Sequence, residues 1–150
     1  ALEEIRFAYE ELDIRSFWAR PNFFNHRNLG DRYYDPIWEL LQELDVPFAT
    51  HEFMGLQGQS EGVDRFRTFT EWHTMVHQVE AQAACLSMIV HGVFERFPEL
   101  RMGVIELGAV WVPSFLRQLE AAMDAVQALM QAGAHAIKIE GEHETGCRAP

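Results

Sequence analysis

Hydrophobic and polar positions along the chain form two kinds of segment. Short runs rich in β-branched and aromatic residues, which are typical of buried strands, alternate with longer stretches whose apolar residues recur every three or four positions, as in amphipathic helices. The strand-like runs are residues 14–20, 46–51, 101–107 and 134–140. The helix-like stretches are residues 1–12, 35–44, 71–94 and 110–131. This regular alternation predicts a parallel sheet covered by helices and joined by right-handed crossovers.

Local signals sharpen some of these boundaries. Asp35 and Pro36 predict a helix start, with the aspartate as N-cap and the proline at the first helical position. Gly133 stands where a glycine would end the helix before it. Residues 52–70 contain three glycines and no clear periodicity, so we expect a long loop there, and long loops in compact domains are often functional.

Two architectures fit this pattern of elements. Open doubly wound sheets and (β/α)8 barrels both alternate parallel strands with helices. A complete barrel needs about 250 residues, whereas this chain has 150 residues and four strand-like runs. The sequence therefore predicts an α/β fold of parallel (β/α) units, about half of a (β/α)8 TIM barrel if the barrel architecture applies.

Composition and charge restrict the function classes. With 48% hydrophobic and 23% charged residues, the chain has a globular composition. Its formal net charge of -11 argues against nucleic acid and anionic membrane surfaces as partners, because both would be repelled. No apolar window is long enough to span a membrane, and residues 1–4 show no signal-peptide pattern. The two cysteines cannot form a disulfide framework, so we expect a cytoplasmic protein.

Polar side chains follow each predicted strand, at the point where it ends. Arg20 and Asn22 follow the first strand, His51 ends the second, Glu106 falls at the end of the third, and Glu140 ends the fourth. Parallel strands place these ends on one edge of the sheet, where α/β enzymes carry their chemistry. Imidazole and carboxylate groups together suit a divalent metal such as zinc, so this edge is the predicted site.

Two further histidines leave an alternative open. His73 and His77 stand four residues apart in a helical segment and therefore share a face. Such a pair can chelate zinc, but the glutamate of an HExxH motif is replaced by Thr74. We favour the simpler interpretation that both histidines cap the helix start or face solvent. His91, near the end of the same segment, is interpreted as structural.

Several motifs resemble the amidohydrolase-related metal-dependent hydrolases, in the branch that includes aminocarboxymuconate-semialdehyde decarboxylase. The motifs are RPN at 20–22, NLGD at 28–31, YDPIW at 34–38, GVFERFPELR at 92–101 and ELGAVWVP at 106–113. Each motif alone is modest, but their order and spacing together are specific. The resemblance covers about residues 1–120.

The resemblance implies a (β/α)8 barrel with one catalytic divalent metal, usually zinc. The reactions of this family are hydrolysis or non-oxidative decarboxylation of small carboxylated or aromatic compounds. His51 matches the family's metal-binding histidine, and Glu106 lies where members place a histidine or a glutamate, which makes it the catalytic candidate. Arg20 and Asn22 correspond to substrate-binding positions.

The chain also departs from the family pattern. The resemblance implies a His-x-His or Glu-x-His pair on the first strand and an aspartate on the last strand, and neither is found at the corresponding place. Residues 121–150 form an additional helix-strand unit with a polar tail, and their sequence around 128–141 resembles ketopantoate hydroxymethyltransferase, in which the residue matching Glu140 binds magnesium. We therefore expect a half-barrel over residues 1–120 and a segment of possible different origin after it.

Three functional hypotheses follow. The first is a metal-dependent hydrolase or decarboxylase that acts on a small molecule. The second is a non-catalytic half-barrel fragment or chimera that self-associates into a homo-oligomer, because open strand edges favour pairing. The third is a fragment of a ketopantoate hydroxymethyltransferase-like enzyme. Metal content separates the first from the second, and zinc against magnesium separates the first from the third.

Overall fold

The computed structural model describes residues 1–51 and 65–131. The chain divides into two compact units, residues 1–109 and residues 110–150. The first unit contains a sheet and most of the helices, and the second contains the helix α5 (Val112–Gln131). Each unit is considered by itself below. None of the described helices is both long enough and apolar enough to cross a membrane.

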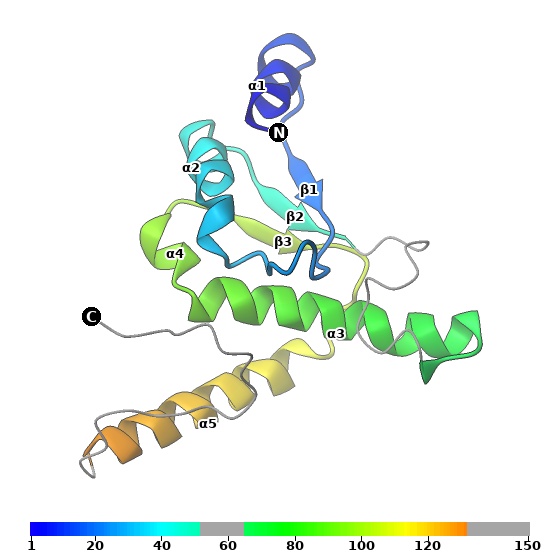
Figure 1. Cartoon of the computed structure of the whole chain (residues 1–150), viewed down its shortest axis with the longest axis vertical. Helices are drawn as coiled ribbons and strands as arrows, with labels where there is room; N and C mark the ends of the chain where they lie inside the picture. The colour runs from blue at the N-terminus through cyan, green and yellow to red at the C-terminus, as the bar shows by residue number, and fades with distance from the viewer. Residues whose placement is uncertain (52–64, 132–150) are drawn as a thin grey trace. The chain divides into compact units, whose positions relative to one another are not determined.

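The sheet of the first unit has three short parallel strands in sequence order (Figure 1). They are β1 (Phe17–Ala19), β2 (Phe48–Thr50) and β3 (Met102–Val104). Phe48 of β2 pairs with Phe17 on one side and with Met102 on the other. The parallel pairing in sequence order is as predicted, and the predicted fourth strand, residues 134–140, lies outside the described residues.

Helical segments connect and flank these strands. In chain order they are α1 (Leu2–Glu11), the 3-10 turn η1 (Arg32–Tyr34), α2 (Asp35–Glu43), α3 (Phe69–Val90) and α4 (Val93–Arg96). The prediction of alternating helices and strands is thus confirmed for residues 1–51 and 65–109.

The start of α2 differs from the sequence-based expectation. The N-cap residue is Tyr34, and Asp35 already belongs to the first helical turn, so its prediction as N-cap was wrong. The displacement arises because η1 runs directly into α2, with Asp31 capping η1 through a bond from the Tyr33 amide. The Asp35 carboxylate is thereby left to accept a different partner, Arg96 of α4.

Helix α3 begins two residues earlier and ends earlier than predicted. Its N-terminus is a capping box, in which the Thr68 hydroxyl accepts from the Glu71 amide and the Glu71 carboxylate accepts from the Thr68 amide. It ends at Val90 because Gly92 adopts a left-handed conformation with φ of 66°. The expected single helix over residues 71–94 is therefore two helices, α3 and the short α4.

The buried face of α3 is made largely of small and polar residues. Five of its seven buried residues are small or polar, namely His77, Glu80, Ala81, Ala84 and Ser87, whereas several apolar side chains of the same helix are exposed. Four of these recur on one side of the helix and are called here the α3 apolar stripe: Met75, Val79, Leu86 and Val90. Small side chains on the buried face allow α3 to lie close to the rest of the unit.

The hydrophobic core joins the sheet to helices from distant parts of the sequence. Trp38 and Leu41 of α2, Phe48 of β2 and Met88 of α3 are all buried in it. The rings of Trp38 and Phe48 meet edge to face with centroids 4.8 Å apart, an arrangement that aromatic pairs favour. This core holds β2 in place by packing it against α2 and α3.

The segment after β1 packs against α3 through a glycine. The Gly30 amide donates a hydrogen bond of 3.0 Å to the Ser87 hydroxyl. A Cβ atom at position 30 would lie 2.2 Å from the Ser87 carbonyl oxygen, far inside contact distance. Only glycine therefore fits at this close approach of two backbones.

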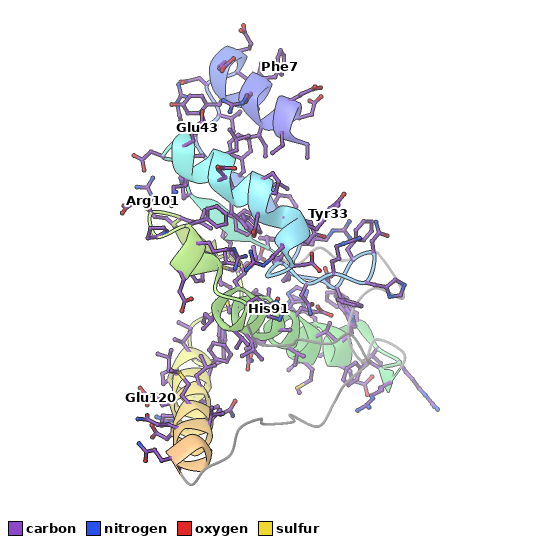
Figure 2. All side chains as sticks on the ribbon, turned by 60° about the vertical axis from the view of Figure 1, so that its left-hand side comes forward. Phe7, Tyr33, Glu43, His91, Arg101 and Glu120 are labelled. Carbon is purple, nitrogen blue, oxygen red and sulfur yellow. The ribbon has the colours of Figure 1, made fainter. Side chains whose placement is uncertain are left out.

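Charged contacts lie at the amino-terminal edge of the sheet. Arg101, labelled in Figure 2, immediately precedes β3 and donates both to the Asp45 carboxylate at 2.8 Å and to the Asp45 carbonyl at 2.6 Å. Asp45 lies in the turn before β2 and has a φ of 52°. These bonds join the residues that precede β2 and β3, at the end of the sheet opposite to the candidate site.

Candidate functional site

The carboxyl edge of the sheet carries the polar side chains that the sequence pattern singled out. Arg20 directly follows β1, His51 directly follows β2, and Glu106 lies two residues after β3. Backbone bonds extend the pairing to this edge, from the His51 amide to the Ala19 carbonyl and from the Ile105 amide to the Thr50 carbonyl. Regular, hydrogen-bonded backbone thus leads up to each of these polar residues.

His51 and Glu106 are in direct contact. The Nε2 atom of His51 lies 2.6 Å from the Oε2 atom of Glu106, across neighbouring strands. The His51 side chain is 31% exposed and that of Glu106 is 69% exposed, so the pair is open to solvent on the glutamate side. The Trp18 ring meets the imidazole edge-on at 5.7 Å. The predicted proximity of the two residues is confirmed.

The backbone at Glu106 is unusual. Its φ is 63°, in the left-handed region that a residue with a side chain adopts only at an energetic cost. This conformation turns the chain sharply after β3. Unfavourable backbone geometry of this kind is concentrated at functional sites.

The predicted substrate-binding residues lie on the same edge. Asn22 is 8% exposed and Arg20 is half-buried, and both take part in interactions with other groups. Their position after β1 places them at the carboxyl edge beside the strand that carries His51. Glu140, the candidate from the fourth predicted strand, lies outside the described residues.

The histidine pair of α3 differs from the interpretation that we favoured. His77 is 8% exposed and so neither caps the helix nor faces solvent, which corrects that interpretation, whereas His73 is exposed. The His73 Nδ1 and His77 Nε2 atoms lie 3.3 Å apart. His91, labelled in Figure 2, is the exposed C-cap of the same helix and lies apart from this pair in the sequence.

Electrostatic interactions link His77 to the strand-end pair. Burial lowers the pKa of His77 below its usual value, and His73 lowers it further. Glu106 acts in the opposite direction and His51 in the same direction, each with a smaller effect. Burial therefore favours the neutral form of His77, and both strand-end residues lie close enough to affect its pKa. The run of small residues at 81, 84 and 87 on one helical face was the sequence signal for this buried side.

A divalent metal can be tested against these donors. An imidazole nitrogen and a carboxylate oxygen are ligands that zinc accepts. However, ligands bound at about 2.0–2.2 Å to a tetrahedral ion stand about 3.3 Å or more from each other, and His51 and Glu106 are closer, at 2.6 Å. Among residues 1–51 and 65–131, no group of three or more potential ligands converges. The donor chemistry fits a metal, and the set is incomplete.

The family model described as Amidohydrolase (Amidohydro_2) matches residues 1–148. The chain belongs to this amidohydrolase family, as its motifs indicated. The match extends beyond residue 120, into residues 121–148, which were expected to form an additional unit. No curated protein sequence matches the chain.

Solved structures show the same fold. An amidohydrolase from Mycobacterium avium subsp. paratuberculosis is 25% identical, with a TM-score of 0.65 over 87% of this chain and 34% of its own. A dihydroxybenzoic acid decarboxylase from Polaromonas, with bound manganese and the inhibitor 2-nitroresorcinol, is 22% identical, with a TM-score of 0.57 over 69% of this chain and 32% of its own. A 2,6-dihydroxybenzoate decarboxylase from Rhizobium is 21% identical, with a TM-score of 0.56 and coverages of 69% and 33%. The chain thus spans about a third of each.

Proposed function

We propose that this chain carries part of the active site of a metal-dependent hydrolase or non-oxidative decarboxylase acting on a small carboxylated or aromatic compound. The observation that carries the proposal is the contact between His51 Nε2 and Glu106 Oε2, 2.6 Å apart at the carboxyl edge of the parallel sheet. In barrels of parallel (β/α) units this edge carries the chemistry. The decarboxylases among the structural neighbours support the choice of reaction.

Each residue has a distinct proposed role. His51 would hold the ion, for which we propose zinc, through Nε2, and the ion would polarise a carboxylate or carbonyl oxygen of the substrate. Glu106 would then lose its hydrogen bond to Nε2 and be free to hold a proton at Oε2 and pass it to the substrate. Arg20 would pair with an anionic substrate group, and Asn22 would orient it by hydrogen bonding.

The exchange of partners at His51 is the central step of this proposal. Nε2 cannot donate a hydrogen to the glutamate and offer a lone pair to an ion at the same time. If Nε2 held an ion, its hydrogen would pass to Glu106, which lies 2.6 Å away and would then carry the proton. Because the described residues provide an incomplete ligand set, we expect weak binding, in the range where the ion is readily lost.

Metal titration tests the proposal. Manganese(II) can be followed by its paramagnetic effect on water protons, for the unmodified chain and for the His51→Ala, Glu106→Gln and His26→Ala variants. His26 is an exposed histidine in the loop after β1 and serves as the matched control. We expect uptake by the unmodified chain and the control, and its loss in His51→Ala. Equal uptake by His51→Ala would remove His51 from the site.

Activity gives the second readout. The chain with zinc or manganese can be incubated with 2,6-dihydroxybenzoate and the release of carbon dioxide measured. We expect slow release that Glu106→Gln abolishes while metal uptake persists. Uptake with no release from any dihydroxybenzoate would contradict the decarboxylase assignment.

A further inference from the structure

The histidine pair of α3 has no role in the site proposed above. His73 and His77 stand one turn apart on α3, and the ring centroids are 4.2 Å apart at an angle of 72°. The two nitrogens that face each other, His73 Nδ1 and His77 Nε2, are 3.3 Å apart. A metal ion bound by both rings would require a particular distance between these two nitrogens.

The nitrogen separation matches tetrahedral chelation. Two imidazole nitrogens that both bind a zinc-sized ion at about 2.0–2.1 Å with a tetrahedral angle are about 3.3 Å apart. The observed 3.3 Å equals this tetrahedral separation, whereas the 90° angle of a square-planar ion would bring the two nitrogens to about 2.8 Å. In contrast, His51 and Glu106 at 2.6 Å must separate before both can bind one ion. The His73–His77 pair therefore needs less rearrangement than the His51–Glu106 pair before both of its members can bind one ion.

Aromatic neighbours orient both rings. The Phe69 ring stacks on His73 at 5.2 Å with an interplanar angle of 18°. The Trp72 ring meets His77 edge-on, also at 5.2 Å. These contacts restrict the rotation of both imidazoles, so less conformational entropy is lost when an ion binds. His73 is exposed and His77 is buried, so an ion would reach the pair from the side of His73.

We propose that His73 and His77 form a second metal site, a bidentate imidazole chelate for Cu(II), Ni(II) or Zn(II), separate from the strand-end site at His51. The remaining positions on the ion are taken by water. Imidazole ligands favour these ions, whereas magnesium and manganese prefer oxygen ligands.

The proton balance of this site is simple. In the metal-free pair one nitrogen donates its hydrogen to the other. When the ion binds, the donating nitrogen gives up that hydrogen and the second nitrogen of the same ring takes one from water. Both rings stay neutral, both facing lone pairs become available, and no net proton is released.

Copper(II) is the chosen probe because its affinity is the highest in the divalent series. Its square-planar preference brings the two nitrogens closer by about 0.5 Å, which rotation of the two side chains supplies. Equilibrium dialysis counts bound copper, and electron paramagnetic resonance counts the coordinating nitrogens. The variants are His73→Ala, His51→Ala and, as a control on the same helix, His91→Ala. Far-UV circular dichroism checks that each variant folds; His73 is exposed, so its replacement leaves the buried face of α3 intact.

The expected result is one equivalent of copper, bound with two imidazole nitrogens, that is lost in His73→Ala and kept in His51→Ala and His91→Ala. Equal copper uptake by His73→Ala and the unmodified chain would overturn the proposal. Loss of the same equivalent in His51→Ala would also overturn it, because the ion would then be held by the strand-end residue. A manganese titration of His73→Ala should match that of the unmodified chain, which separates this site from the proposed function.

Discussion

The Arg96 guanidinium holds both carboxylate oxygens of Asp35, a residue 61 positions earlier in the sequence. Its Nε donates to Oδ2 at 3.0 Å and its Nη2 donates to Oδ1 at 2.6 Å. Both side chains are only 21% exposed, so water screens this pair less than it screens a surface pair. The fork joins α4 to the first turn of α2, and the same guanidinium also donates to the carbonyl of His91.

Replacing Arg96 should therefore destabilise the first unit. We expect Arg96→Ala to lower the free energy of unfolding by about 1–3 kcal/mol, between the values typical of exposed and of buried pairs. Arg96→Lys should restore only part of this loss, since an ammonium group cannot form the two parallel bonds. Chemical denaturation measures the effect. Arg6→Ala, which breaks the exposed pair with Glu43, is the control and should change much less.

Glu106 allows the backbone and the carboxylate to be tested separately. Glu106→Gln keeps the left-handed backbone and removes the charge, whereas Glu106→Gly removes the side chain and relieves the conformation with φ of 63°. We expect the glycine variant to be more stable than the glutamine variant by about 1 kcal/mol. Thermal unfolding of the two variants decides the point. A glycine variant less stable than the glutamine variant would show that contacts of the side chain at position 106 stabilise the turn.

The capping box of α3 predicts a pH dependence. Hydrogen bonds from the Thr68 hydroxyl, the Thr68 amide and the Arg67 amide hold the pKa of Glu71 below its usual value of 4.5. A lowered carboxyl pKa contributes stability that is complete above the unfolded-state pKa and is lost as pH falls through the folded-state pKa. The protection factors of the amides in the first turn of α3, which compare the observed with the intrinsic exchange rate at each pH, should fall between about pH 5 and pH 3.

The control for this prediction is Glu71→Gln. Its amide oxygen can still accept from the Thr68 backbone, but it does not titrate in this range. The protection factors at the helix start should then be lower than in the unmodified chain at pH 7 and show no further fall in acid. The same fall in the variant would assign the effect to another carboxylate.

The α3 apolar stripe predicts self-association. Its residues are 41–63% exposed and recur along one side of the helix, which is unusual for the surface of a monomer. Light scattering should show a dimer or a larger species. We expect Val79→Glu with Leu86→Glu to give a monomer, because charge on the stripe opposes its burial. Thr74→Glu, an exposed position beside the stripe, should leave the mass unchanged, and a monomeric unmodified chain would contradict the prediction.

Gly30 gives the sharpest packing test. An added methyl group would meet the Ser87 carbonyl oxygen at 2.2 Å, so either the loop or α3 has to move. We expect Gly30→Ala to cost about 1–3 kcal/mol, as overpacked sites do. At Gly103 in β3, an added methyl group would have nothing within 4 Å, and Gly103→Ala should be tolerated. Equal stability of the two variants in denaturant would show that the loop after β1 yields easily.

The sequence predicted the elements whose signals are local. The β-branched runs located the three described strands, and the alternation with helices predicted their parallel order. The rule that strand ends share an edge predicted the contact of His51 with Glu106. These predictions succeeded because periodicity and chain direction determine them directly.

Other features depend on packing between distant segments, which periodicity does not encode. His77 was assigned to the helix surface because the large apolar residues that periodicity follows lie on the exposed side of α3, and only the small residues at 81, 84 and 87 mark its buried face. Asp35 was taken for a cap because its partner, Arg96, is 61 positions away. The break of the long helix at Gly92 depends on one backbone angle, and a single glycine within a periodic run does not specify that angle.

The two ends of the sheet carry different kinds of polar contact. Each described strand is only three residues long and spans about 10 Å. The charged ties at Arg101 and Asp45 lie before one end of the strands, and the imidazole and carboxylate lie beyond the other. A mutational library directed at positions 20, 22, 51 and 106 would leave those ties intact, and one directed at the ties would leave the reactive groups in place. Variants at the ties can on this basis be screened for stability alone, whereas variants at the opposite end need a stability screen as well, because substitution at Glu106 alters an unfavourable backbone conformation.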